Sequence, residues 1–262
     1  MNELKAHLIP VAPGASDDNA PVFILGMFRT GSTLLEQIFA AHPRFQPLGE
    51  SEFWPREVHS LGGGMIKPGR RPNVTQQAES KARWQEHLHE RCVSDGVRVT
   101  DKRPYDLFHI ATILDVLPNA KIIISERDWR DTLISVYGTR LHPQHGYATE
   151  PAAIADHIRL CHQIADFWIE ALPDRIKRVS YEALVEDPES TLQELFAWLG
   201  ERWDPACLAF YQLNNSVRTA SVWQVREPLS TGRKGRWRYY EAPLRKRFDA
   251  ALDEPLPPKL PA

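Results

Sequence analysis

The chain has 262 residues, of which 42% are hydrophobic and 25% are charged, a composition typical of a globular protein with one sizeable α/β core. Its formal net charge of −2 excludes a strong overall attraction to nucleic acid or to an anionic membrane. The three cysteines lie too far apart for a metal-ligand spacing or a disulfide framework, which favours a reducing, cytoplasmic compartment. No apolar stretch approaches the ~20 residues of a membrane span, so none is expected.

The stretch from residue 22 to residue 43 combines a buried strand, a glycine-bounded loop and a helix start. Val22–Leu25 is an apolar, β-prone run, and a helical pattern begins after Gly31 and continues to residue 41. Loop N–H groups and a helix N-terminus at such a turn both point at an anion. The loop is nearly the nucleotide motif G-x-x-x-x-G-K-[ST], but Ser32 replaces the lysine and Arg29 is its cation. This pattern predicts a site for a phosphate-like group, but not for the β/γ-phosphates of ATP.

Strands and helices alternate along the rest of the chain. Residues 45–72 are irregular in composition, with several prolines and three consecutive glycines, which predicts a loop or lid. The patterns predict strands at 97–100, 121–125 and 176–179, and helices at 76–92, 107–117, 129–137, 154–172, 190–199, 205–213 and 242–252. Alternation of this kind implies βαβ units. We therefore expect an α/β protein of the P-loop type, with three αβα layers around a central parallel sheet of about four to five strands.

Polar side chains follow each of the four predicted strands. Arg29 and Ser32 come after the first strand, Lys102 after the second, Arg127 after the third and Tyr181 after the fourth. Ligands of parallel α/β proteins bind at the carboxyl ends of the strands. The sequence therefore predicts that these five residues meet in one site.

Four sequence blocks in order resemble a known family. They are FRTGSTLLEQIFAAHP (28–43), DKRP (101–104), SERDWRDTLISVY (125–137), and VRTASVWQVREPL with RKGRW (217–237). Together they resemble the sulfotransferases that use 3′-phosphoadenosine 5′-phosphosulfate (PAPS), in particular the branch of protein-tyrosine sulfotransferases and bacterial relatives, some with tetratricopeptide repeats. The resemblance implies a metal-independent enzyme that moves a sulfuryl group from PAPS to an acceptor hydroxyl.

The resemblance also implies a domain organisation. It covers roughly residues 20 to 250, so we expect an N-terminal arm (1–20), a single sulfotransferase domain (21–252) and a proline-rich tail (253–262). Within the domain, residues 53–72 would form a lid or acceptor loop. The basic segment 214–238 would close over the donor.

PAPS carries two anionic groups, a 5′-phosphosulfate and a 3′-phosphate, so the family needs two anion sites. The first loop resembles the family's 5′-phosphosulfate site, which assigns to it Arg29, Thr30, Gly31, Ser32 and Thr33. Arg127 and Ser135 match the positions that contact the 3′-phosphate, where an arginine can bind bidentately. The alternative for Arg127 is an ion pair with Asp131 in the following helix. Asp128 and Asp131 are expected to cap that helix.

The last third of the chain supplies further candidates for donor contacts. Arg233, Lys234 and Gly235 resemble the late basic loop that closes on the 3′-phosphate, although Arg236 stands near the place of a family glycine, which leaves a solvated basic face as the alternative. In relatives a tyrosine at the position of Tyr181 lies near the adenine; the alternative is a core aromatic residue. Candidates for ribose or phosphate contacts are Ser221 and Arg226.

Catalysis by this family is an in-line displacement, which requires positioning, charge stabilisation and a base for the acceptor proton. Relatives of this branch place a glutamate in a segment like PLGESEFWP, so Glu50 is the expected base and Glu52 the alternative. The cytosolic small-molecule branch uses a histidine; His109 and His145 are present but outside that branch's motif. Lys102, with help from Arg29, would neutralise the oxygen that bridges sulfur and phosphorus.

Three other functions remain open from the sequence. A P-loop kinase would need the missing loop lysine and a magnesium-binding aspartate in place of Ser125-Glu126-Arg127. A nucleic-acid-binding module could use basic and aromatic residues of 218–247, against the overall charge of −2. A degenerate, non-catalytic donor-binding protein would not need Glu50 and Lys102. The expected acceptor is a small-molecule or peptide hydroxyl, phenolic or otherwise, in a pocket shaped by residues 53–72 and 142–149, and the oligomeric state is open.

Overall fold

The computed structural model describes residues 19–65, 67, 69–139, 141–213 and 225–253. Five parallel strands form one sheet in the order β2-β3-β1-β4-β5. Their bounds are β1 Val22–Gly26, β2 Phe45–Gly49, β3 Arg98–Lys102, β4 Lys121–Glu126 and β5 Ile176–Ser180. The prediction of a P-loop-type αβα fold with about four to five parallel strands is confirmed.

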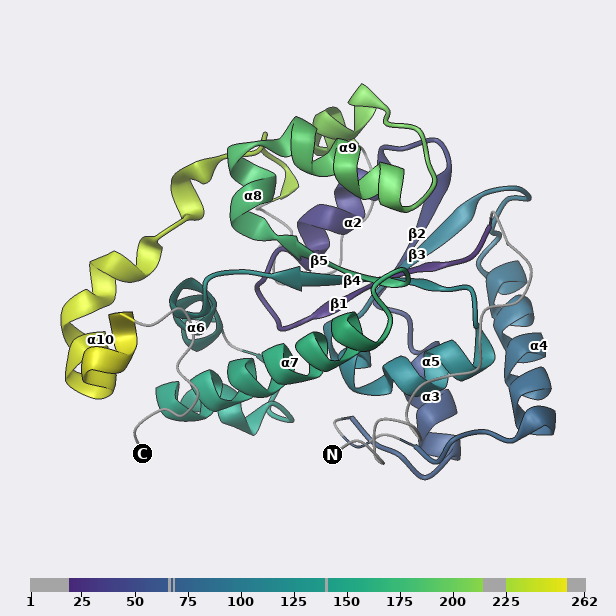
Figure 1. Cartoon of the computed structure of the whole chain (residues 1–262), viewed down its shortest axis with the longest axis horizontal. Helices are drawn as coiled ribbons and strands as arrows, with labels where there is room; N and C mark the ends of the chain where they lie inside the picture. The colour runs from purple at the N-terminus through teal and green to yellow at the C-terminus, as the bar shows by residue number, and fades with distance from the viewer. Residues whose placement is uncertain (1–18, 66, 68, 140, 214–224, 254–262) are drawn as a thin grey trace.

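Helices cover both faces of the sheet (Figure 1). In Figure 1, α2, α8 and α9 lie on one side of it, and α3, α5 and α7 lie on the other. The helices are α2 Ser32–Ala40, α3 Phe53–Ser60, α4 Val74–Glu90, α5 Ile110–Val116, α6 Trp129–Tyr137, α7 Pro151–Ala171, α8 Tyr181–Glu186, α9 Pro188–Trp198 and α10 Glu241–Phe248. Short 3₁₀ segments are η1 Pro104–His109, η2 Gly146–Thr149, η3 Pro205–Gln212, η5 Thr231–Arg233, η6 Arg236–Tyr240 and η7 Asp249–Asp253.

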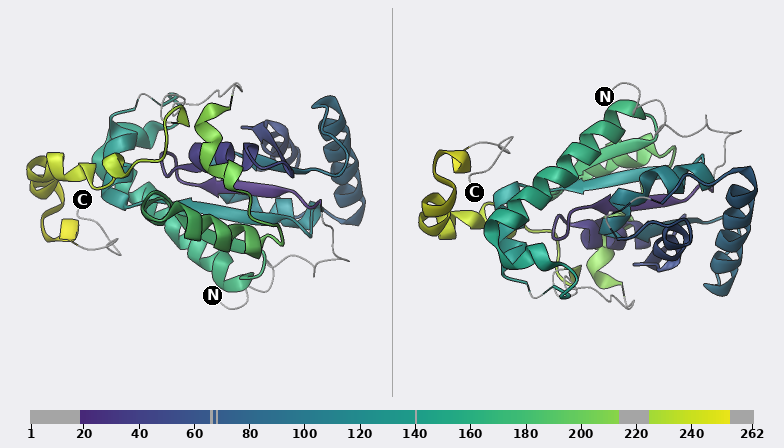
Figure 2. Two further views of the ribbon diagram at one scale, coloured as in Figure 1. Left: turned by 90° about the horizontal axis from the view of Figure 1, so that it is seen from above. Right: turned by 90° about the horizontal axis from the view of Figure 1, so that it is seen from below.

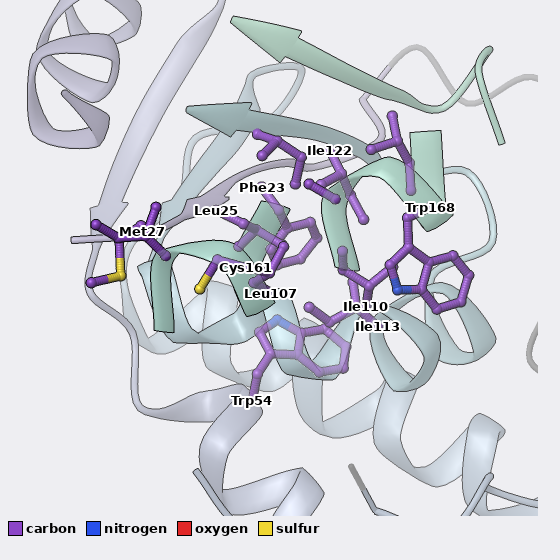
Figure 3. Close-up of a cluster of buried hydrophobic side chains, with 14 of the residues drawn as sticks. Phe23, Leu25, Met27, Trp54, Leu107, Ile110, Ile113, Ile122, Cys161 and Trp168 are labelled. Atoms are coloured by element: carbon purple, nitrogen blue, oxygen red, sulfur yellow. The ribbon is translucent and has the colours of Figure 1, made fainter. Parts of the chain in front are cut away.

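The two central strands β1 and β4 are largely apolar on both faces because both faces of the sheet are covered there. In β1, Phe23 and Leu25 enter the hydrophobic cluster under α3, α5 and α7, whereas Val22 and Ile24 enter the cluster under α2 and α9. This alternation is the two-residue period of a strand. Figure 3 shows the first cluster, in which Trp54 lies with residues of the strands and of α5 and α7.

Residues 45–60, expected from the sequence to be irregular, instead form β2 and α3. Pro47 weakens the strand pattern, but β2 is an edge strand, where a missing N–H donor is tolerated. α3 is anchored by Trp54, which is completely buried. The pairing of β2 with β3 shifts register between Pro47 and Gly49. This irregularity lies directly before Glu50.

The register of the sheet brings the ends of β3, β1 and β4 together. Ile24 of β1 pairs with Lys102 at the end of β3, and Gly26 pairs with Ser125 of β4. The loops that follow these strands therefore lie side by side. The C-terminal elements η6 and α10 lie near α6, beyond the same end of the sheet (Figure 2).

Two further features concern only the part of the chain that the structure describes. None of the helices formed by these residues combines the length and the apolar character needed to cross a bilayer. The same residues contain no group of three or more histidine, cysteine or acidic side chains placed to hold a metal ion.

Candidate functional site

The loop after β1 is shaped for close approach of an anion. Gly31 has a φ of +97° and precedes α2 without a side-chain cap, so the first N–H groups of the helix are left for a ligand. Arg29, at a φ of +69°, adopts the left-handed conformation that is uncommon for a non-glycine residue. Ser32 and Thr33 are buried at the helix start.

Thr30 stabilises this loop from within. Its hydroxyl donates to the carbonyl oxygen of Met27, at 2.7 Å, and forms a hydrogen bond with the hydroxyl of Ser125, also at 2.7 Å. The structure thus places the Thr30 side chain between β1 and β4. Because the Thr30 hydroxyl is bonded within the protein, the predicted contact of Thr30 with the donor would be made by its backbone.

Three arginines from distant parts of the chain gather beside the loop. Arg29 donates from Nε to the hydroxyl of Ser135, at 3.1 Å, and Arg127 donates to the carbonyl oxygen of Arg233. Burial lowers the pKa of Arg29, and the neighbouring charges of Arg127 and Arg233 lower it further. Like charges held this close create a local field that favours an anionic ligand.

Arg127 is held by two other contacts. Its Nη2 lies 3.3 Å from Asp131 Oδ2, and its guanidinium carbon lies 4.6 Å from the centre of the Tyr181 ring. Its Nε is buried and has no hydrogen-bond partner among the described residues. A buried polar atom is nearly always hydrogen-bonded, so this N–H fits a ligand oxygen.

Two cavities share the three arginines. One, of about 620 Å³ including its open part, adds Gly31, Thr33 and Tyr181 to an apolar wall of Leu34, Val185, Phe210, Val225 and Leu229. The other, of about 770 Å³, adds Ser135, Asp131, Thr139, Arg236 and Tyr240. A cation cluster with an apolar wall on one side fits a nucleotide, whose phosphates and base need these two environments.

Tyr181 packs on the loop as well as on Arg127. A Cβ atom at Gly31 would lie 2.9 Å from Tyr181 Cδ2, so only glycine leaves room for this ring. Burial raises the pKa of the Tyr181 hydroxyl. The sequence predicted that Tyr181 lies near the adenine or, alternatively, is a core aromatic residue. The two predictions are compatible, because the ring lines the cavity while being mostly covered.

The late basic segment is fastened to α6 through Asp131. Its two carboxylate oxygens accept the backbone N–H groups of Gly235, at 2.6 Å, and of Trp237, at 2.9 Å. Asp128, not Asp131, supplies the side-chain cap of α6. Asp131 lies in the first turn of α6, where an acidic residue was expected to favour the helix N-terminus, but its bonds to Gly235 and Trp237 were not predicted.

The other predicted donor contacts are placed less centrally. Lys234 forms an ion pair with Glu186. Arg226 is exposed, donates to the carbonyl oxygen of Leu213 at 2.5 Å, and lines neither of the two cavities. Ser221 lies outside the described residues.

Glu50 and Lys102 form the second centre of the site. Lys102 is the last residue of β3 and is completely buried, and its Nζ lies 2.5 Å from Glu50 Oε1. Glu52 instead forms an ion pair with Arg103, at 2.7 Å. The two candidate bases thus differ in their ion-pair partners, because Glu50 contacts the buried Lys102 and Glu52 contacts Arg103.

A wide cleft opens beside Glu50. It has about 1660 Å³ including its open part and is lined by Phe28, Glu50, Glu52, Pro55, Arg56, His59, Gly64, Met65, Arg103, Pro104, Tyr105, Asp106, His109, His142, Gln144 and His145. The ring of His145 stacks on Tyr105 with 5.0 Å between centres, and Phe28 meets both rings edge-on. Phe28 directly precedes Arg29 in the chain, so the cleft adjoins the anion loop.

Of the histidines that line the cleft, His109 and His145 were considered as candidate bases, and they differ in their availability. His109 uses both ring nitrogens, towards Asp106 Oδ1 and the carbonyl oxygen of Gly64, each at 3.0 Å. His145 bonds to the hydroxyl of Tyr105 at 3.0 Å, and burial lowers its pKa. These contacts make His109 a structural residue and leave His145 as a neutral group in the wall of the cleft.

Glu36, a buried residue that was not among the predicted site residues, lies beside Glu50 and Lys102. Glu36 of α2 accepts the N–H of Gly49 at 3.0 Å, and burial raises its pKa to about 7. The nearby charge of Lys102 lowers that pKa and Glu50 raises it. A charged residue inside the otherwise apolar helix pattern LLEQIF was the available signal.

The chain is similar in sequence to known proteins. The model of the "Sulfotransferase family" matches residues 21–205. An uncharacterised protein of Aquifex aeolicus is 30% identical over 84% of this chain and 31% of its own length. A protein-tyrosine sulfotransferase of Drosophila melanogaster is 25% identical over 90% of this chain and 52% of its own length. The chain therefore spans about a third to a half of the length of these two relatives.

Solved structures show the same fold. The sulfotransferase domain of the olefin synthase from Synechococcus PCC 7002 superposes with a TM-score of 0.62, at 20% identity, over 88% of this chain and 91% of that chain. Mouse sulfotransferase SULT7A1, solved in complex with 3′-phosphoadenosine 5′-phosphate (PAP), gives a TM-score of 0.50 at 15% identity, over 90% and 84%. Both likenesses concern the fold alone.

Proposed function

Because this chain belongs to the sulfotransferase family, we propose that it is an enzyme that transfers a sulfuryl group from PAPS to an acceptor hydroxyl. The observation that carries the proposal is the convergence of Arg29, Arg127 and Arg233 on one cavity, with the buried Nε of Arg127 unpaired among the described residues. The mouse relative was solved with PAP, the product that remains when PAPS loses its sulfuryl group. An adenine nucleotide with two separate anionic ends suits this cavity.

The chain's own groups divide the work of binding the donor. The N–H groups at Gly31 and the start of α2, with the hydroxyls of Ser32 and Thr33, would hold the 5′ end. Arg127, Ser135 and Arg233 would hold the 3′-phosphate. Arg29 lies between the loop and Ser135, so it can contact either end.

The sulfuryl transfer would take place between the cavity and the cleft. The acceptor oxygen forms a bond to sulfur while the bond from sulfur to the bridging phosphate oxygen breaks, and that oxygen keeps the electron pair. Glu50 takes the acceptor proton, and Lys102 neutralises the charge that develops on the leaving oxygen. This assignment is supported by the ion pair of Glu50 with Lys102, by the position of Glu50 in the wall of the cleft, and by the pairing of Lys102 with the strand that leads to the anion loop.

The acceptor would enter through the cleft lined by Phe28, Tyr105 and His145. A wall of aromatic rings suits a flat, partly apolar group, such as a phenol, on a small molecule or a peptide. The name of the Drosophila relative supports a hydroxyl of the tyrosyl kind. A reducing, cytoplasmic setting is part of the proposal and is supported by three free thiols, Cys92, Cys161 and Cys207.

Calorimetric titration with PAP, ADP and ATP tests the donor assignment directly. PAP should bind more tightly than either control because only PAP carries a 3′-phosphate. Incubation with PAPS and a panel of phenols, tyrosyl peptides and simple alcohols should then yield PAP and a sulfated product. Preference for ATP, or magnesium-dependent ATP turnover, would replace this proposal with a kinase.

A further inference from the structure

Glu36 is a buried carboxyl group to which the proposed reaction gives no role. Its side chain is 4% exposed, and it lies one helical turn after Ser32, on the helix that begins at the anion loop. Burying a carboxyl group is costly, so its contacts must compensate for that cost. Those contacts lead to the turn that carries Glu50.

The hydrogen bond from Gly49 N–H to Glu36 Oε1, 3.0 Å long, joins α2 to the end of β2. Gly49 has a φ of +74°, and the register of β2 on β3 shifts between Pro47 and Gly49, so Leu48 is left out of the pairing. An irregularity of this kind redirects the side chain that follows. Here the following side chain is Glu50, which is turned towards Lys102.

The charges around Glu36 come from two elements. Lys102 and Asp101 belong to β3, and Glu50 follows β2. Because burial raises the pKa of Glu36 to about 7, the side chain exists in both protonation states near neutral pH. A carboxylate and a protonated carboxyl group both offer an oxygen acceptor, so the bond to Gly49 persists while the charge changes.

We propose that Glu36 is a positioning residue, whose hydrogen bond to Gly49 fixes the turn that holds Glu50 against Lys102. The inference rests on the proposed function, since it gives Glu50 the part of the base. It connects the helix of the donor loop to the base across the edge of the sheet. The position of the turn depends on the hydrogen bond between Glu36 and Gly49, and not on the charge of Glu36.

Two substitutions separate these properties. Glu36→Gln keeps an oxygen acceptor at full reach and removes the charge, whereas Glu36→Asp keeps the charge and withdraws the carboxylate by one methylene. We expect kcat with PAPS and the best acceptor of the panel to fall at least about tenfold in Glu36→Asp and to stay within about threefold in Glu36→Gln. KM for PAPS and the Kd for PAP should stay within about twofold in both. Gln37→Asn, the same shortening at a neighbouring residue that is also 4% exposed, is the matched control and should behave as wild type.

A second measurement does not depend on turnover. The amide of Gly49 should exchange with solvent deuterium faster in Glu36→Asp than in wild type, and at the wild-type rate in Glu36→Gln. If wild type shows no sulfuryl transfer but this exchange pattern holds, the proposed function fails and the hydrogen bond stands. Equal exchange in all variants would overturn the positioning role. So would loss of kcat in Glu36→Gln with activity kept in Glu36→Asp, or a loss of PAP affinity in Glu36→Asp.

Discussion

The carboxylate of Glu50 and the ammonium of Lys102 form an ion pair, with 2.5 Å between Oε1 and Nζ. Their surroundings differ: the side chain of Lys102 is 1% exposed and that of Glu50 is 38% exposed. Glu50 is therefore open to the cleft, whereas Lys102 is covered by other residues. An anionic donor that draws the ammonium towards itself would leave the carboxylate free to accept a proton.

The first prediction concerns the choice between two glutamates. Glu50→Gln should lower kcat by at least about 100-fold, because the amide cannot take the acceptor proton. The affinity for PAP should stay near the wild-type value. Initial-rate kinetics with PAPS and calorimetry with PAP check both expectations.

Glu52→Gln is the matched control for that experiment, since Glu52 pairs with Arg103 outside the buried centre. It should retain near wild-type kcat. Full activity in Glu50→Gln together with a large loss in Glu52→Gln would transfer the base to Glu52.

The second prediction concerns Arg127. Arg127→Ala should weaken PAP binding by about 10- to 100-fold, the range expected for losing charged hydrogen bonds to a phosphate. Binding of adenosine 5′-phosphate should change much less, because it lacks the 3′-phosphate. Competition calorimetry with the two nucleotides measures the difference. Arg245→Ala, an exposed arginine of α10 paired with Glu241 and Asp253, should change neither affinity. Equal losses for both nucleotides would assign Arg127 to the 5′ end instead.

The third prediction concerns the shape of the anion loop. Gly31→Ala should abolish PAP binding, because the new methyl group would lie 2.9 Å from Tyr181 Cδ2 at a φ of +97°. Gly200→Ala is the control: its φ is +75°, but no atom lies within 4 Å of the added Cβ. That variant should lose only about 1 kcal/mol of stability from backbone strain and should bind PAP normally. Normal binding by both variants would show that the contact of Tyr181 with the loop is dispensable.

The fourth prediction concerns the pH dependence of stability. The pKa of Glu36 is raised by burial from an ordinary 4.5 to about 7 in the folded protein. The stabilising contribution of such a group is fully present below pH 4.5 and is lost as the pH rises through 7. The loss amounts to about 3 kcal/mol at 1.36 kcal/mol for each pH unit.

Glu36→Gln cannot lose this contribution, because the amide does not ionise. The free energy of unfolding of the variant, relative to that of wild type, should therefore increase by up to about 3 kcal/mol between about pH 5 and about pH 8. Urea unfolding at several pH values measures this gain. A constant difference between the two proteins across that range would show that Glu36 titrates normally.

Local patterns were enough to predict the elements that have strong signals of their own. The helix at Trp129–Tyr137 was predicted with its observed bounds, because an aspartate cap precedes an amphipathic run. The strand at Lys121–Glu126 followed from its β-branched residues. The strand at Phe45–Gly49 was not predicted, since it has a proline in its middle and is stabilised by pairing with β3.

The same limit applies to the site. The predicted strand pattern placed Arg29, Lys102 and Arg127 after the ends of strands, and the sheet order brings those ends together. The roles of Glu36 and Asp131 depend on backbone N–H groups of residues far along the chain, 13 and 104 or more positions away. Nearly every residue type has a backbone N–H group, so a hydrogen bond to the backbone does not require a particular partner residue. Sequence motifs therefore cannot predict such contacts.

The attachment of residues 235 and 237 to Asp131 has a consequence for turnover. The Trp237 side chain is buried in the hydrophobic cluster, with the guanidinium carbon of Arg130 4.3 Å from the centre of its ring. The backbone of the stretch is fastened to α6 by a few polar contacts, because the Asp131 carboxylate binds the two N–H groups and also faces Arg127. Such contacts can break locally without disturbing the sheet. Glu50 and Lys102 belong instead to the turn after β2 and to the end of β3. Under the proposed function, release of the nucleotide product and the transfer step would depend on separate parts of the molecule, so a substitution in one part could change the rate of one step without changing that of the other.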